Sequence, residues 1–278
     1  MGFLLYLLVS GDVLYLGLCL VAVGVVVAAW HSNLGRCFSG GGLVLAIVSA
    51  VPIHPAAYAI LALSAAAWQV SLKRSANVRR GMDIALILAL VGVLGAALAV
   101  RGDSRLALPR DNAVFVLGDS ISAGVGASKE GTWPQLLSAR LNLSVSNLAQ
   151  PGATLADGAS QARAIPKDPA IVLVELGGND LLGGAAPERF GTDLRSLLAT
   201  LMSRDHRLLM FELPLLPFQN AFGRIQREAC KEYGVTLVPR SILAGAIALP
   251  GHASDGLHLS AQGHSWLAAR MSEMWLGG

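Results

Sequence analysis

Three short motifs in the second half of this 278-residue chain carry residue types that suit acyl transfer. A serine hydroxyl is a weak nucleophile at neutral pH and needs an adjacent base. Histidine suits that task because its pKa lies near neutral pH, and its second ring nitrogen needs an acceptor such as a carboxylate. The motifs are Gly118-Asp119-Ser120-Ile121-Ser122, Gly177-Gly178-Asn179-Asp180 and Asp255-Gly256-Leu257-His258.

The motifs supply a complete set of roles for ester hydrolysis. Ser120 is the candidate nucleophile and His258 the base, while Asp255, three residues earlier, can orient the imidazole from the same turn. His252 also lies three residues from Asp255 and is the alternative partner. The remaining requirement is a set of donors for the oxyanion, each of which typically stabilises the transition state by about 3–4 kcal/mol.

Three groups are candidate oxyanion donors: the backbone N–H of Ser120, that of Gly152 in Gln150-Pro151-Gly152-Ala153, and the side-chain amide of Asn179. Asp119 and Asp180 are expected to be structural hydrogen-bond partners of these loops. Trp133 is expected to pack a helix rather than to contact substrate.

The elements that must position these residues alternate between strands and helices. Short runs rich in Val, Ile and Leu predict buried parallel strands at 113–117, 143–148, 171–176, 207–212 and 235–238. Helical patterns lie between and after them at 133–141, 155–164, 187–203, 219–233 and 261–275. The alternation predicts an open parallel sheet with helices on both faces, in which ligands bind beyond the carboxyl ends of the strands. Ser120 and Asn179 each follow a strand within three residues and are expected at that edge, which the loop of His258 can also reach.

These residues resemble the four sequence blocks of the SGNH/GDSL hydrolase family. The stretches 171–180 and 131–137 are similar to its bacterial thioesterase I/lysophospholipase/arylesterase subgroup, and the resemblance covers roughly residues 112–275. It implies a flavodoxin-like three-layer αβα sandwich that hydrolyses esters or thioesters. The implied nucleophile is Ser120, with His258 and Asp255 completing the triad and Gly152 and Asn179 the oxyanion hole. No metal or cofactor is expected.

Composition separates this half from the first. Apolar residues make up 54% of the whole chain and charged residues only 14%, against roughly 25% charged in an ordinary soluble domain. Residues 106–278 are nearly neutral, with 14 Lys and Arg against 15 Asp and Glu, so they lack the basic face that nucleic acid requires.

Residues 1–105 are expected to form a transmembrane region that precedes the hydrolase domain, 106–278. Three apolar stretches, 3–30, 42–70 and 84–100, are long enough to cross about 30 Å of hydrocarbon. The loop 71–82 holds four basic residues, which predicts that it is cytoplasmic. With three spans, the hydrolase domain is then extracytoplasmic, on the periplasmic side of a bacterial inner membrane. If Pro52–Pro55 is instead a hairpin tip, four spans result, and the domain is expected on the inner side.

The sequence therefore predicts a membrane-anchored serine hydrolase of acyl esters such as lysophospholipids, with membrane lipids as its surroundings. The apolar loops 181–186 and 213–218 are expected to line an acyl pocket. A deacetylase or acyltransferase of cell-envelope glycans would use the same triad and stays open as an alternative. A second alternative is a catalytically degenerate domain whose membrane half binds a partner, although the intact triad disfavours it.

Overall fold

A computed structural model describes residues 2–101, 113–126, 131–202 and 206–276. The chain divides into two compact units. The α/β unit comprises Met1–Tyr6, Gly102–Pro214 and Ala221–Gly278, and the helical unit comprises Leu7–Arg101 and Leu215–Asn220. The boundary predicted between residues 105 and 106 lies outside the described residues.

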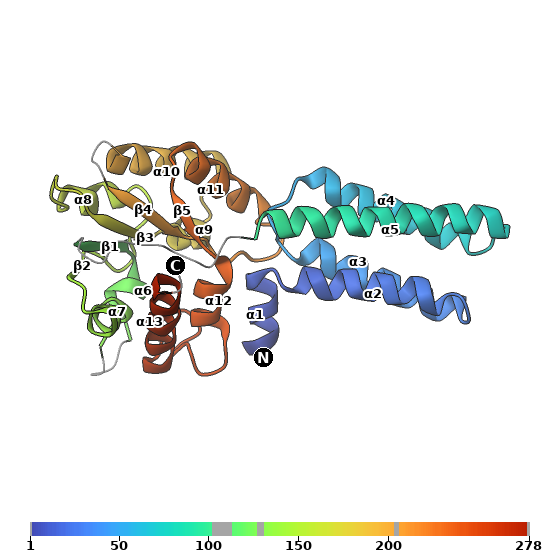
Figure 1. Cartoon of the computed structure of the whole chain (residues 1–278), viewed down its shortest axis with the longest axis horizontal. Coiled ribbons are helices and arrows are strands. Elements are labelled where there is room, and N and C mark those ends of the chain that lie inside the picture. The colour runs from blue at the N-terminus through green and yellow to red at the C-terminus, as the bar shows by residue number, and fades with distance from the viewer. Residues whose placement is uncertain (1, 102–112, 127–130, 203–205, 277–278) are drawn as a thin grey trace. The chain divides into compact units, whose positions relative to one another are not determined.

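The α/β unit is built on one parallel sheet of five strands in the order β2-β1-β3-β4-β5. The strands are β1 (Val114–Gly118), β2 (Val145–Asn147), β3 (Ile171–Glu175), β4 (Arg207–Phe211) and β5 (Thr236–Val238) (Figure 1). Every residue of β1 and β3 is buried, which explains why both read as continuous apolar runs. This strand order changes direction between β1 and β3, where open α/β sheets bind their ligands.

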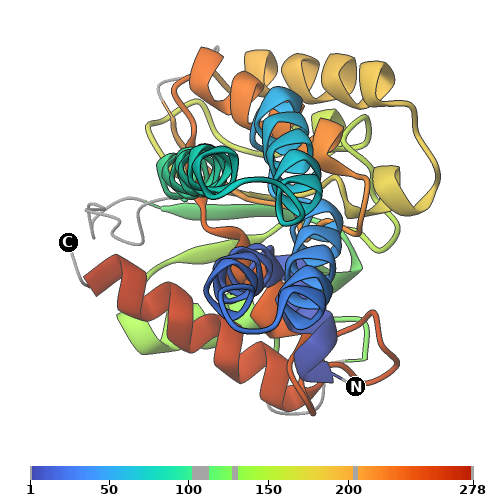
Figure 2. The same ribbon diagram turned by 90° about the vertical axis from the view of Figure 1, so that its right-hand side faces the viewer.

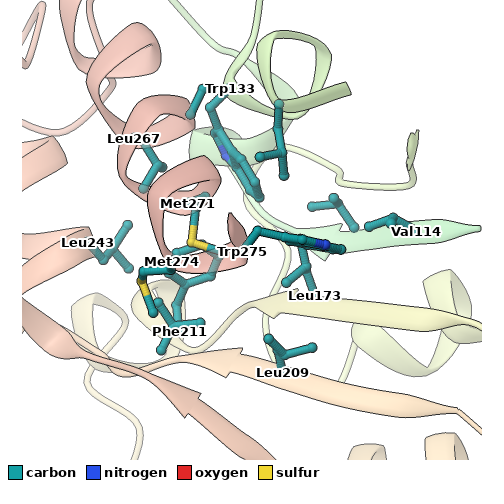
Figure 3. Packing of buried hydrophobic residues seen from close by; sticks show 14 of the residues in the cluster. Val114, Trp133, Leu173, Leu209, Phe211, Leu243, Leu267, Met271, Met274 and Trp275 are labelled. Atoms are coloured by element: carbon teal, nitrogen blue, oxygen red, sulfur yellow. The ribbon is translucent and has the colours of Figure 1, made fainter. Parts of the chain in front are cut away.

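Helices cover both faces of the sheet and make the predicted three layers (Figure 1). One face carries α7 (Trp133–Leu141), α12 (Arg240–Ala248) and α13 (Ala261–Leu276), and the other carries α8 (Gly158–Arg163), α10 (Pro187–Met202) and α11 (Asn220–Glu232). The core beneath the first face includes Trp133, Phe211, Met271 and Trp275 (Figure 3). Trp133 and Phe211 meet edge to face with ring centroids 5.5 Å apart.

All five predicted strands are confirmed to within two residues at each end, and the five predicted helices to within three. Residue 203, the predicted end of the fourth helix, lies outside the described residues. Among the described residues of the α/β unit, three helices were not predicted: α12, and the one-turn helices α6 (Ser120–Ala123) and α9 (Gly178–Leu182).

The helical unit contains α2 (Val13–Val27), α3 (Ser32–Val48), α4 (Pro55–Ser71) and α5 (Ala76–Ala99), preceded by the short α1 (Gly2–Ser10). Figure 2 looks along these helices from their ends. Glycines let α2 and α3 pack closely, since a Cβ on Gly17 would lie 2.6 Å from the carbonyl oxygen of Gly42. A Cβ on Gly24 would similarly lie 2.7 Å from that of Gly35.

The predicted single span over 42–70 is wrong. Residues 49–54 separate α3 from α4, so the two prolines of this stretch lie in or beside a turn rather than inside a kinked helix. The turn is closed by Tyr58, whose hydroxyl donates to the carbonyl of Val51 at 2.9 Å.

Of the other two predicted spans, one is a pair of bent helices and the other is a single continuous helix. The stretch 3–30 is broken into α1 and α2, whose axes are bent by 89° and which are long and apolar enough to cross a membrane only as a pair. Among the described residues, α5 is the one helix that is long and apolar enough to cross a bilayer by itself.

Candidate active site

Ser120 begins the one-turn helix α6 directly beyond the carboxyl end of β1. Asp119 caps this helix, because its Oδ1 accepts a hydrogen bond of 2.9 Å from the backbone N–H of Ile121. Gly118, which precedes Asp119, is held by Gln161 of α8. The side-chain amide of Gln161 accepts from the N–H of Gly118 and donates to its C=O, both at 2.9 Å. The nucleophile candidate is therefore carried by a backbone segment that is fixed on two sides.

Gly118 is required by packing rather than by conformation. A Cβ at this position would lie 2.6 Å from Ser122 Oγ and 3.0 Å from Glu175 Oε2. The glycine of the first motif thus leaves room for a buried polar cluster beneath Ser120.

Asn179 lies at the same sheet edge, in α9, just beyond β3. β1 and β3 pair in parallel with Gly118 opposite Glu175, so the loops that follow the two strands start side by side. The Asn179 amide nitrogen donates to Asp119 Oδ2 and to the carbonyl oxygen of Ala153, both at 3.0 Å. The structure thus joins the first and second motifs through a direct hydrogen bond.

Gly152 lies in the turn between β2 and α8, next to Ala153, which accepts the bond from Asn179. Its φ of +79° is a conformation that L side chains rarely adopt, and a Cβ there would meet nothing within 4 Å. Gly152 is one residue from Ala153, whose carbonyl oxygen accepts a hydrogen bond from the Asn179 amide.

Asp255 and His258 form a compact pair in the loop before α13. Asp255 Oδ2 lies 2.7 Å from His258 Nδ1, while Asp255 Oδ1 accepts from the backbone N–H groups of Leu257 and His258 at 2.9 and 2.8 Å. These bonds, with the one from the imidazole first, hold the pKa of Asp255 well below its usual range. His252 does not share this carboxylate, because it is buried and its Nδ1 lies 2.8 Å from the carbonyl oxygen of Gly245.

The Asp255–His258 loop lies against the segment that follows Ser120. A Cβ on Gly126, just beyond α6, would lie 3.0 Å from Ser254 Oγ and 3.7 Å from the Cβ of His258. Within the described residues, Ser120 Oγ makes no hydrogen bond. Catalytic hydrogen bonds are often long in structures without substrate.

Two buried carboxyl groups lie under the nucleophile. Glu175, at the end of β3, is 2% exposed, and burial followed by the charge of Asp119 raises its pKa well above the usual value. Burial also raises the pKa of Asp119, but hydrogen bonds from the backbone of Ile121 and from the Glu175 side chain oppose that rise. Sequence reasoning missed Glu175 because it is a single polar residue within the apolar run predicted as a strand over 171–176.

Other residues have structural contacts. Asp180 Oδ2 accepts from the N–H of Leu155 at 3.0 Å, and Trp133 is fully buried. In the two predicted pocket loops, Leu182 is 63% exposed, whereas Leu213 is buried with its methyls beside Gly177. Residues 215–218 belong to the helical unit.

A model of the GDSL-like Lipase/Acylhydrolase family matches residues 116–266, which is more than half of the chain. The chain belongs to this family. The matched region includes every candidate site residue.

Among individual relatives, thioesterase 1/protease 1/lysophospholipase L1 of Escherichia coli is 30% identical over 169 residues, which are 58% of this chain and 81% of that protein. Esterase TesA of Pseudomonas aeruginosa is 32% identical over 158 residues, covering 52% and 78%. A crystal structure of TesA superposes with a TM-score of 0.54 at 29% identity, covering 59% of this chain and 98% of that one. The protein is thus an ester hydrolase of the SGNH fold, as the sequence predicts.

A matched pair of glycine variants tests the position of Gly152. Gly152→Ala and Gly234→Ala both place a methyl group on a residue with positive φ and open space, so each should cost about 1–2 kcal/mol of stability. Only Gly152→Ala should also lower kcat for an aryl ester, by about tenfold or more, because it displaces an oxyanion donor. Thermal unfolding and steady-state kinetics measure the two effects. Equal kcat values in the two variants would show that Gly152 is not part of the oxyanion hole.

Proposed function

We propose that this protein is a membrane-anchored serine ester hydrolase that works through a covalent acyl-enzyme. The observation that carries the mechanism is the 2.7 Å bond between Asp255 Oδ2 and His258 Nδ1, on a loop packed beside the segment that follows Ser120. With Nδ1 held by the carboxylate, Nε2 is the nitrogen that is left to accept a proton from the serine hydroxyl.

In the acylation step, Ser120 Oγ attacks the ester carbonyl carbon while His258 Nε2 removes its proton. Asp255 stays ionised and stabilises the imidazolium that forms. The imidazolium then gives its proton to the leaving alkoxide or thiolate as the bond from the carbonyl carbon breaks. Deacylation repeats these steps with water as the nucleophile, releases the acid and regenerates the serine.

The oxyanion of each tetrahedral intermediate would be bound by the N–H groups of Ser120 and Gly152 and by the Asn179 amide. In the described structure, both protons of the Asn179 amide nitrogen are already directed to acceptors, Asp119 Oδ2 and the carbonyl oxygen of Ala153. The oxyanion therefore has to share or displace the bond to Ala153, the acceptor that adjoins Gly152. The bond to Asp119 remains and keeps the amide in place.

Replacing the nucleophile tests this mechanism. Ser120→Ala should lower aryl-ester hydrolysis by about 10⁴-fold or more, because no acyl-enzyme can form. It should also abolish covalent labelling by a fluorophosphonate, whereas Ser122→Ala, which removes a buried hydroxyl two residues away, should still be labelled. Unfolding temperature provides the control for folding. Hydrolysis by Ser120→Ala at the wild-type rate would refute the mechanism.

The exposed surface of the helical unit supports embedding in a membrane. α5 has 24 residues and is about 36 Å long, enough to cross a bilayer. Many of its large apolar side chains are exposed, as lipid contact would require: Ile84, Ile87, Leu88, Val91, Leu94 and Leu98. Only one charged residue, Asp83, lies between residues 81 and 100, and it accepts a hydrogen bond of 2.8 Å from Trp68 Nε1.

Connectivity and charge support an extracytoplasmic position for the hydrolase domain. The basic segment 71–82 is separated from the hydrolase domain by α5 alone, so a cytoplasmic segment places the domain outside. The number of helices before α4 changes only the side of the N-terminus. With segment 71–82 in the cytoplasm, a hairpin at Pro52–Pro55 would therefore leave the proposed side of the domain unchanged.

Reporter fusions test the proposed side. Alkaline phosphatase fused after Gly278, which is active only when exported, should be active, and a green fluorescent protein at the same position should be dark. Changing Lys73, Arg74, Arg79 and Arg80 to Glu should weaken or invert this pattern, because it removes the charge bias. A fluorescent fusion of the unaltered chain would contradict an extracytoplasmic domain.

We propose acyl esters with apolar chains, such as lysophospholipids, as substrates, because a membrane anchor would hold the site close to lipid. Leu182 lies one helical turn after Asn179 and is exposed, so it can contact an acyl chain. Leu182→Ser should lower kcat/KM for decanoyl esters several-fold more than for acetyl esters. Leu276→Ser, at a similarly exposed leucine at the end of α13, is the control.

Equal effects on both acyl lengths would exclude Leu182 from the acyl site. The alternative substrates, acetylated envelope glycans, would be recognised by release of acetate rather than long-chain acid from envelope fractions.

A further inference from the structure

The polar cluster beneath Ser120 contains two carboxyl groups that must share one charge. Asp119 and Glu175 are both buried, and Glu175 Oε2 lies 3.4 Å from the backbone N–H of Asp119. Two neighbouring carboxyls in a site that excludes water resist ionising together, because the second charge would be poorly solvated and repelled by the first. The pair is therefore expected to share one proton.

Hydrogen-bond directions decide which one. Asp119 accepts on both oxygens, from the N–H of Ile121 and from the Asn179 amide, and this favours the carboxylate, which is an acceptor only. Glu175 Oε2 accepts from Ser122 Oγ at 2.8 Å and lies 3.4 Å from the N–H of Asp119. Both donors therefore reach the same oxygen of Glu175, which leaves Oε1 to carry the proton.

Two of the three charge effects on the pair favour this assignment. His258 favours the charge on Asp119, whereas Asp180 in α9 opposes it. The charge of Asp119 is the main electrostatic influence on Glu175 and favours its protonated form. The effects of His258 and of Asp119 therefore favour a proton on Glu175 and a charge on Asp119, and the smaller effect of Asp180 acts against them.

We infer that Glu175 is a positioning residue for the oxyanion hole, which as a neutral acid donates to Asp119 and thereby keeps the amide nitrogen of Asn179 toward the reacting carbonyl. An asparagine side chain has two ends of similar size, and only the NH₂ end can bind an oxyanion. An ionised Asp119 holds that end, whereas a protonated Asp119 would equally well donate to the amide oxygen. This inference rests on the proposed function of Asn179 and extends it to a residue that does not touch substrate.

The consequence for pH has a definite sign. Because burial and the charge of Asp119 raise the pKa of Glu175 in the folded protein, Glu175 keeps its proton to higher pH than an exposed glutamate and loses it only as pH rises through that raised pKa. Glutamine carries an N–H donor and a C=O acceptor at all these pH values and can replace both groups of the neutral acid. Leucine is similar in size and can replace neither.

The experiment compares Glu175→Gln and Glu175→Leu in the full-length protein. Glu175→Leu should lower kcat by about 10²-fold with KM changed less than threefold, because an oxyanion donor is lost in the transition state. Glu175→Gln should retain kcat within about threefold, and its pH profile of kcat/KM should superpose on that of wild type between pH 5 and 8. Glu212→Gln, which changes a buried carboxylate held by Arg227 and Arg240 at the end of β4, should lower the unfolding temperature without changing the profile.

Two results would overturn the inference: a Glu175→Leu enzyme with wild-type kcat, or a Glu175→Gln enzyme as impaired as Glu175→Leu. Infrared spectroscopy gives a readout that needs no activity, because wild type at pH 7 should show the carbonyl stretch of a protonated carboxylic acid and Glu175→Gln should lack it. Absence of that band from wild type would also overturn it. A failure of the proposed function looks different, since wild type would then neither hydrolyse esters nor react with the fluorophosphonate.

Discussion

The parallel pairing of β1 with β3 is the constraint on which the rest of the site depends. With Gly118 opposite Glu175, the two strands end together, and the loops that follow carry Ser120 and Asn179 away from the same edge. The strand order changes direction at this point, so neither neighbouring connection covers the edge. Asp119 and Asn179 are sixty residues apart in the sequence, and a hydrogen bond from Asn179 to Asp119 joins the two loops.

The site motifs could be predicted from the sequence because they follow short apolar runs whose length and composition define buried strands. What could not be predicted depends on contacts between distant segments. Glu175 becomes significant only when Ser122 and Asp119 are placed against it, 53 and 56 residues away. Helix α12 was missed because it is buried over much of its surface and has a glycine at its centre, Gly245, which lies against Trp266. It therefore shows no clear apolar stripe to distinguish it from a loop.

The error over 42–70 has a related cause. An apolar run shows that a segment is buried or lies in lipid, but its length does not tell where the chain turns. The turn was signalled by Pro55, because proline favours the first position of a helix, where its missing N–H costs nothing. Ala50, with φ of +52°, and the Tyr58–Val51 hydrogen bond complete the reversal, and both depend on the folded unit.

The buried cluster also explains why Trp133 contributes more than packing. An indole N–H can only donate, and it donates to Ser122 Oγ at 3.2 Å. The serine proton is then directed to Glu175, and the acid proton of Glu175 to Asp119. Asp119 has only acceptors left for Asn179, which must present its nitrogen. A donor-only group in the core thus sets the polarity of four successive side chains, and a purely apolar residue at position 175 would break this sequence at its middle.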